Sequence, residues 1–228
     1  MKLKTYIYID GFNLYHRRLK NTSYKWLDLK ALFQRLLDNE KHEIVGIKYF
    51  TAIVSGKFDP QKPIRQQAYL RALQHSIPEI SIHYGQFMSH NVWAPFSKER
   101  KAKHWKNRKE ILIPLNKIVP RNSAAEIIKT EEKGSDVNLA VHLLNDAWLK
   151  KYDCAIVLSN DSDLKEAITL VKEHHKKLIG LALPPNCFPS KELMEVAHFV
   201  KQIRNSSLAV SQLPAAITGT NIHKPEGW

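Results

Sequence analysis

The sequence is poor in cysteine and lacks a long apolar run. Its two cysteines are Cys154, inside an apolar run, and Cys187, after two prolines. This pair supplies neither a disulfide framework nor zinc ligands at motif spacing. No run approaches the ~20 apolar residues of a spanning helix, and the N-terminal apolar stretch ends at Asp10. We therefore expect a soluble protein of the reducing cytoplasm that does not enter a membrane.

Glycine is also scarce, with eight residues spread along the chain. None of them forms a Gly-rich phosphate loop ending in Lys-Ser or Lys-Thr, and Gly46 and Gly56 lie too far apart for one. Nucleotide hydrolysis at such a loop is therefore not expected.

The charge of the chain points to a polyanionic partner. Lys and Arg total 35 against 22 Asp and Glu, which gives a formal net charge of +13. Basic proteins bind nucleic acids by neutralising phosphates and releasing counterions. RNA is the partner expected first, with DNA as an alternative. A homodimer is also compatible with the sequence.

Short apolar runs alternate with segments of helical period along the 228 residues. This alternation is typical of a parallel sheet with helices on its faces, an α/β fold. Strands are expected at residues 6–9, 44–54, 80–87, 155–158 and 178–183. Helices are expected at 28–38, 61–75, 137–149 and 164–174. We predict one domain over residues 1–205 and a loosely held tail over 206–228, where two prolines occur among polar residues.

The alternation of strands and helices stops at residues 88–132. A connector of this length is uncommon in a short-loop architecture, so we interpret these residues as a basic insertion. Trp105 lies among its basic residues. The basic side chains can follow the phosphate backbone while the aromatic ring stacks on bases, which suits single-stranded RNA. A solvated charge run is the alternative. Arg17 and Arg18 offer a second basic surface. The basic residues proposed to bind nucleic acid in the insertion are Lys98, Arg100, Lys101, Lys103, Lys106, Arg108 and Lys109.

Four acidic residues occupy positions that a parallel sheet would bring together. Asp10 and Asp161 each follow a strand, and the carboxyl ends of parallel strands share the edge where ligands bind. Asp136 and Asp163 each begin a helix, in line with its sheet-facing apolar stripe. Carboxylates crowded in this way repel one another unless cations occupy the site.

Helix capping is the simpler explanation for some of these residues. Asp is common at N-caps, and for Asp136 or Asp163 taken alone this explanation is as good as a catalytic one. A coincidence of Asp10, Asp161 and a third acid at one edge is harder to obtain from capping. Asn13 suits two roles equally, orienting a water in the site or capping the helix that follows Asp10.

Ligands that are all oxygen select hard ions, so Mg²⁺ or Mn²⁺ is the expected cofactor. Such ions lower the pKa of a water nucleophile and neutralise charge on phosphoryl oxygens. The expected reaction is phosphodiester hydrolysis, with Asp10, Asp136, Asp161 and Asp163 as metal ligands and catalytic residues, supported by Asn13.

Three blocks make the sequence similar to the NYN family, in its LabA-like or DUF88 branch of the PIN-like nucleases. They are the stretches at residues 9–15, 132–140 and 158–164. The resemblance implies a three-layer α/β/α sandwich, an acidic Mg²⁺-type pocket and a role in RNA processing or decay. By the same motif Asp10, Asp136 and Asp161 correspond to the metal-binding acids of the family, with Asn13 and Asp163 in supporting positions.

Two positions depart from the family pattern. Asn160 stands where similar proteins usually have Gly, and we expect it to preserve a left-handed turn because Asn tolerates that backbone. His142 stands where an Asp is common. It lies ~120° around the helix from Asp136, so a packed or solvated histidine is favoured over a metal ligand.

Two other classes of protein fit some of these features. A catalytically weak or silent RNA-binding NYN module, acting as a regulator, would keep the fold and the basic insertion, but the retention of all four acids argues against it. A phosphatase of the haloacid dehalogenase type also places an Asp after its first strand. That chemistry requires a second acid two residues later, where this chain has Phe12.

Overall fold

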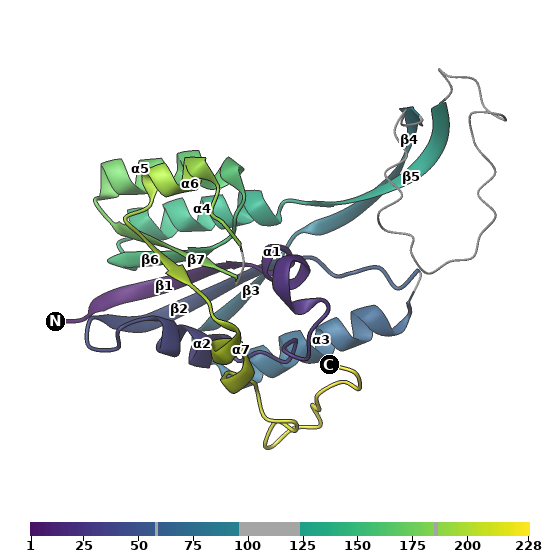
Figure 1. The fold of residues 1–228 in the computed structure, drawn as a ribbon, viewed down its shortest axis with the longest axis horizontal. Helices are drawn as coiled ribbons and strands as arrows, with labels where there is room; N and C mark the ends of the chain where they lie inside the picture. The colour runs from purple at the N-terminus through teal and green to yellow at the C-terminus, as the bar shows by residue number, and fades with distance from the viewer. Residues whose placement is uncertain (58, 96–123, 185–186) are drawn as a thin grey trace. The chain divides into compact units, whose positions relative to one another are not determined.

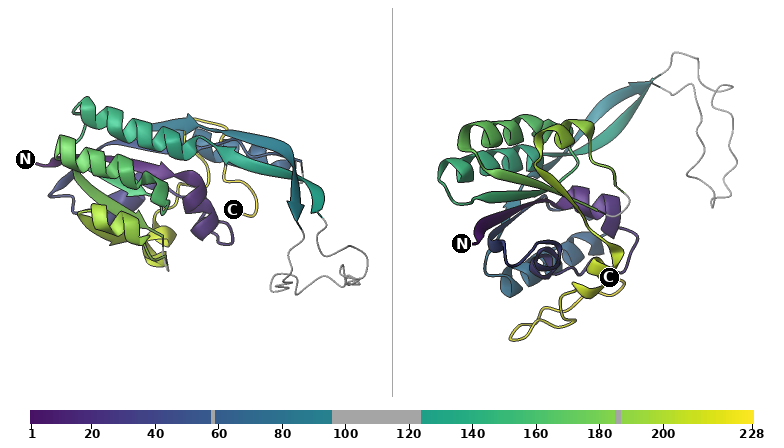
Figure 2. Two further views of the ribbon diagram at one scale, coloured as in Figure 1. Left: turned by 90° about the horizontal axis from the view of Figure 1, so that it is seen from above. Right: turned by 60° about the vertical axis from the view of Figure 1, so that its left-hand side comes forward.

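The computed structural model describes residues 1–57, 59–95, 124–184 and 187–228. These residues form two compact units, Met1–Phe87 with Glu132–Trp228, and Met88–Glu131. Figures 1 and 2 show the ribbon from three directions. The larger unit contains the parallel sheet and its helices. In the described part of the chain, no helix is both long and apolar enough to cross a membrane.

A six-stranded sheet forms the centre of the larger unit. Its strands are β1 (Leu3–Asp10), β2 (His42–Thr51), β3 (Ile80–Tyr84), β6 (Cys154–Leu158), β7 (Leu178–Leu183) and β8 (Phe199–Gln202). Their order is β3-β2-β1-β6-β7-β8, and every neighbouring pair is parallel. The chain moves outward from β1 in one direction and later from β6 in the other. The β1/β6 boundary is therefore the topological switch point, where sheets of this kind bind ligands.

Helices cover both faces of this sheet (Figures 1 and 2). One face carries α2 (Leu29–Leu36), α3 (Gln61–Ser76) and α7 (Asn205–Val210), and the other carries α4 (Ser135–Trp148), α5 (Lys165–His175) and α6 (Lys191–Val196). Two shorter elements are α1 (Gly11–Leu14), continued by a π-helical turn at Tyr15–Leu19, and a 3₁₀ turn at Ser162–Leu164. The predicted α/β/α sandwich with a parallel sheet is confirmed.

The two cores follow from the alternation of side chains along the strands. In β6, Ile156 and Leu158 face the core with α2 and α3, whereas Ala155 and Val157 face the core with α4 and α5. All five residues of β6 are buried, as expected for a central strand with helices on both faces. The sheet edge at the end of β6 is thereby held between two packed layers.

The C-terminal segment is a correction to the prediction of a loosely held tail. Leu208 of α7, Leu213 and Ile217 are buried in the core. The Trp26 indole Nε1 donates to the Pro214 carbonyl oxygen at 2.8 Å, and the Trp228 ring lies 5.8 Å from that of Tyr69. Prolines and polar residues dominate the composition of this segment, but a few apolar side chains hold it against the α2 and α3 face.

A two-stranded sheet is formed by β4 (Gln86–Pro95) and β5 (Ala124–Lys133), and most of it lies in the smaller unit. The hydroxyls of Ser89 and Thr130 lie 2.7 Å apart across this sheet. The expected strand at 80–87 is therefore two elements, because β3 ends at Tyr84 and β4 begins after Gly85. Periodicity did not separate them, since both strands carry apolar residues and only one residue lies between them.

Candidate active site at the switch point

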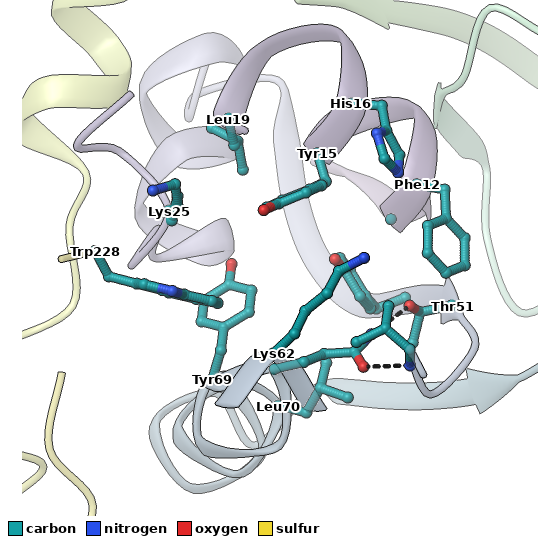
Figure 3. Close-up of a pocket in the computed structure, with 14 residues that line it drawn as sticks. Phe12, Tyr15, His16, Leu19, Lys25, Thr51, Lys62, Tyr69, Leu70 and Trp228 are labelled. Carbon is teal, nitrogen blue, oxygen red and sulfur yellow. Dashed lines mark hydrogen bonds between the residues drawn. The ribbon is translucent and has the colours of Figure 1, made fainter. Parts of the chain in front are cut away.

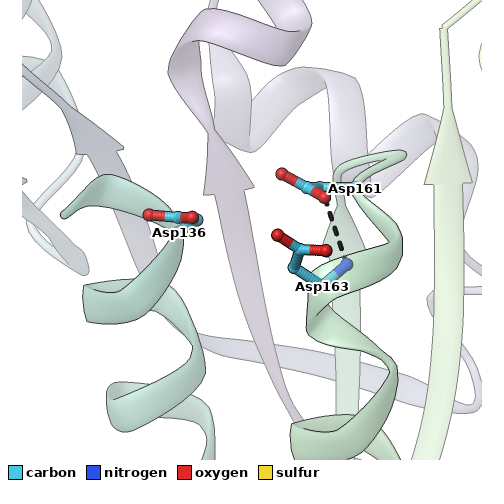
Figure 4. A group of neighbouring side chains, drawn as sticks. All are labelled: Asp136, Asp161 and Asp163. Atoms are coloured by element: carbon cyan, nitrogen blue, oxygen red, sulfur yellow. Dashed lines mark hydrogen bonds between the residues drawn. The ribbon is translucent and has the colours of Figure 1, made fainter. Parts of the chain in front are cut away.

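Three carboxylates meet beside the carboxyl end of β6. Oxygen atoms of Asp136, Asp161 and Asp163 all lie within 4.8 Å of one another. Asp136 and Asp161 are half-buried and Asp163 is exposed. Figure 4 shows Asp136 on α4 facing the other two across a short gap. This spacing allows one cation to be shared by all three carboxylates, and no other group of this kind is found among the described residues.

Asp161 and Asp163 are placed by one local turn. Asp161 follows β6 and is the N-cap of the 3₁₀ turn, where its side-chain oxygen accepts the Asp163 N–H at 3.1 Å. Asp163 is the second residue of this turn, and its side chain lies on the same side as that of Asp161 (Figure 4). The capping alternative therefore holds for Asp161, but not for Asp163. One carboxylate oxygen of Asp161 positions the turn while the group as a whole stays in the cluster.

Asp136 reaches the cluster because of a left-handed residue before its helix. The N-cap of α4 is Gly134, with φ of +93°, a conformation that strongly favours glycine. The Glu132 carboxylate accepts the Ser135 N–H at 3.0 Å, which satisfies one of the free donors of the first turn. Asp136 itself does not cap α4, so capping does not explain it. Its carboxylate is left available to the cluster.

Asp10 lies near Asp161 but outside the group of three acids. It caps α1, accepting the Asn13 N–H at 2.8 Å on one oxygen and the Ser159 hydroxyl at 3.1 Å on the other. Burial raises the pKa of the Asp10 carboxyl. The two hydrogen bonds oppose that rise, and the charges of Asp161 and Glu132 add to it. Three acids thus form the metal-sized cluster, and Asp10 lies beside its Asp161 member.

Comparison with known proteins supports the resemblance of the three sequence blocks. The NYN domain family matches residues 4–206. This chain belongs to the NYN family. NYN domains form part of the PIN-like nuclease superfamily, whose members act on nucleic acids and typically use divalent metals.

Two individual proteins similar to this NYN domain carry different descriptions. The 6-hydroxy-3-succinoylpyridine 3-monooxygenase HspA of Pseudomonas putida (strain DSM 28022 / S16) is 32% identical over 249 residues, covering 99% of this chain and 75% of that protein. The crystal structure of a protein of unknown function from Vibrio parahaemolyticus RIMD 2210633 is 18% identical, with a TM-score of 0.49, covering 90% of this chain and 94% of that one.

Asn13 does not cap the helix that follows Asp10, which was one of its two predicted roles. It lies inside α1, and Asp10 supplies the cap. The Asn13 side-chain oxygen is buried and has no hydrogen-bond partner among the described residues. Sequence reasoning also missed Glu132 and Ser159 as parts of the site. Glu132 could have been noticed because it is an acid three residues before Ser135, the first residue of α4, whose N–H needs an acceptor.

The two departures from the family pattern both have structural roles. Asn160 does not adopt a left-handed backbone, so that prediction is wrong. Its side chain instead accepts the Ser190 N–H at 2.8 Å and donates to the Phe188 carbonyl oxygen at 3.0 Å, which holds the segment before α6. His142 packs with its ring centroid 4.0 Å from that of His83, and its Nδ1 lies 3.1 Å from the Lys48 amine. It is not part of the carboxylate cluster.

The structure describes only two of the residues expected to contact nucleic acid. Arg17 is exposed on the turn after α1, whereas Arg18 donates to the Asn205 side-chain oxygen and so links that turn to α7. Arg18 is therefore partly engaged within the fold. The basic residues of the insertion, with Trp105, lie outside the described residues.

Proposed function

We propose that this NYN domain hydrolyses phosphodiester bonds of RNA at the cluster of Asp136, Asp161 and Asp163. The observation that carries the proposal is the approach of three carboxylates within 4.8 Å at the ligand-binding edge of the sheet. They come from two separate elements, α4 and the 3₁₀ turn. Like charges at this distance repel one another, so the arrangement costs stability unless a cation offsets it.

The donor set fits a hard divalent cation, because carboxylate oxygens suit Mg²⁺ or Mn²⁺ better than softer metals. Asp136, Asp161 and Asp163 would hold it. Bound there, the cation supplies charge neutralisation at the phosphate and activation of a water molecule. Asp10 keeps the neighbouring electrostatic field negative, and the net charge of +13 attracts the polyanionic strand.

The test is cleavage of an end-labelled single-stranded RNA with Mn²⁺, with a DNA of the same sequence in parallel. Asp136→Asn and Asp161→Asn should each lower the rate at least ~100-fold, because both water activation and charge stabilisation weaken. Asp38→Asn is the matched control, since Asp38 is a surface carboxylate bonded to Lys41. Equal cleavage by all four proteins would indicate a contaminating nuclease and reject the proposal. RNA binding without cleavage in the wild type would favour a silent binding module.

A second candidate is the oxygenation of a small pyridine, and the observation that favours it is the 32% identity to the monooxygenase over nearly the whole chain. Such a reaction places one atom of O₂ in the substrate and reduces the other to water, with two electrons from a donor such as reduced nicotinamide. Incubation with 6-hydroxy-3-succinoylpyridine, O₂ and NADH would test it. Loss of substrate matched by NADH oxidation would support this second candidate. If neither occurs and the protein cleaves RNA with Mn²⁺, the second candidate is rejected.

A further inference from the structure

A pocket with aromatic walls opens directly beside the Asp10 edge, on the face covered by α3. Its lining begins at Gly11 and Phe12, the two residues that follow Asp10. Five aromatic residues line it, together with aliphatic side chains of the core (Figure 3). They are Phe12, Tyr15, Tyr49, Tyr69 and Trp228.

Hydrogen bonds and ring packing fix the walls of this pocket. The Tyr69 hydroxyl donates to the Leu27 carbonyl oxygen at 2.8 Å, and the Trp228 ring packs against Tyr69. The Gln66 amide donates to the Ala52 carbonyl oxygen at 2.9 Å and accepts the Val54 N–H at 2.9 Å. A preformed, mostly apolar cavity with a few fixed polar groups is typical of small-molecule sites.

Among the Lys, Arg, Asp and Glu side chains, those that line the pocket are all positive. Lys25 and Lys62 line it, and no Asp or Glu does. Lys25 donates to the Gly227 carbonyl oxygen at 3.3 Å, whereas Lys62 makes no ion pair with any residue that the structure describes. Figure 3 shows Lys62 extending from α3 into the pocket. Burial, followed by the charges of Lys20 and Lys62, lowers the pKa of His16, which also lines the pocket.

We propose that this pocket binds a planar aromatic ring that carries an anionic group, with the ring against Tyr69 and Trp228 and the anion at Lys62. The apolar faces stabilise the ring by stacking. The Lys62 ammonium, which has no ion-pair partner among the described residues, gives the anion a charged hydrogen-bond donor. Two sources share this chemistry, a nucleotide with its phosphate and a free aromatic acid with its carboxylate. Binding there does not require hydrolysis at the carboxylate cluster.

The test is calorimetric titration without divalent cations, using adenosine 5′-monophosphate, adenosine, nicotinate, nicotinamide and inorganic phosphate. At least one aromatic anion should bind ~10-fold more tightly than its neutral counterpart, and phosphate alone should not bind. Lys62→Met should abolish that preference, whereas Lys191→Met, an exposed lysine on α6, should preserve it. Tyr15→Leu should weaken both charged and neutral rings.

The probes also separate the two sources. Binding of the nucleotide alone identifies a nucleotide site, and binding of nicotinate alone identifies a site for a free aromatic acid. Equal affinity for charged and neutral rings, equal binding of phosphate, or binding of none of the probes would overturn the proposal. Repeating the titration with Asp161→Asn keeps this result separate from the nuclease proposal, because that variant changes the cluster and not the pocket.

Discussion

The Ser159 hydroxyl donates a hydrogen bond to the Asp10 carboxylate at 3.1 Å, joining the carboxyl ends of β6 and β1. The Ser159 hydroxyl oxygen also accepts a hydrogen bond from the Asp161 N–H at 3.2 Å. Ser159 is fully buried, so both bonds lie away from competing water. One hydroxyl therefore sets the position of an acid beside the cluster and of an acid within it.

Ser159→Ala should weaken cation binding without removing any carboxylate. We expect ~10-fold to 100-fold lower affinity for Mn²⁺, the usual effect of losing a group that orients metal ligands. The fold should lose only ~1 kcal/mol, as for a typical hydrogen bond. Titration calorimetry with Mn²⁺ measures the affinity, and Ser206→Ala, at an exposed serine, is the control. Unchanged affinity would show that Ser159 does not position Asp161.

The melting temperature of the wild type should rise with Mn²⁺ or Mg²⁺. An ion at ~100 times its Kd adds ~2.7 kcal/mol when it binds only the folded chain. In EDTA, Asp136→Asn should melt no lower than wild type because a like charge has been removed from the cluster, but its rise with Mn²⁺ should shrink. Asp38→Asn should behave as wild type. If millimolar Mn²⁺ leaves the wild type unchanged, the free protein has no preformed cation site.

Asp146→Ala should be strongly destabilising. The buried Asp146 carboxylate lies 2.5 Å from the Lys48 amine and 3.0 Å from the Lys151 amine, and accepts the Tyr8 hydroxyl at 2.9 Å. Removing it leaves Lys48, whose side chain is only 12% exposed, without its counter-charge. The expected loss is about 3–5 kcal/mol in urea denaturation. Lys151→Ala is the matched control and should cost under ~1 kcal/mol, because its side chain is 41% exposed.

Stability should fall as the pH drops from about 6.5 toward 4, in part because of His83. Burial, then the charges of His142 and Lys48, lower the pKa of His83 to about 4, and the Asp146 charge opposes this. The unfolded chain then binds a proton that the folded chain resists, so stability is present above pH ~6.5 and is lost below it.

Replacing His83 tests this assignment. Thermal or urea denaturation of His83→Gln should show a shallower loss of stability between pH 6.5 and 4 than the wild type. Part of the loss should remain, because burial and then Lys48 also lower the pKa of His142. His174→Gln, at an exposed position on α5, serves as the control. A wild-type slope in His83→Gln would mean that other groups cause the acid sensitivity.

The basic insertion should dominate the salt dependence of RNA binding. Changing Lys101, Lys103, Lys106 and Arg108 together to Ala should make the slope of log K against log salt shallower by up to ~3, because each phosphate of a single strand that a cation neutralises adds ~0.7 to the slope. Fluorescence anisotropy with a labelled single-stranded RNA measures the slope. An unchanged slope would place the binding surface elsewhere, and Arg17→Ala would then test the surface beside α1.

The sequence alone was sufficient for the parallel sheet and for the positions of Asp10 and Asp161 at its edge. Buried strands show as short apolar runs, and a residue that follows such a run must lie at the carboxyl end of its strand. The beginning of α4 near Asp136 was also predictable from its apolar stripe. These features are local, and they depend on no partner elsewhere in the chain.

Only the tertiary structure decided which acids form the cluster and which cap a helix. The bond between Ser159 and Asp10 joins residues 149 positions apart, and it holds Asp10 beside the group of three carboxylates. The same applies to the C-terminal segment, where Leu213 and Trp228 find apolar partners around Trp26. Periodicity and composition depend on residues close together in the sequence and so predict local structure. A side chain's hydrogen bonds and burial depend on groups that folding brings from distant positions.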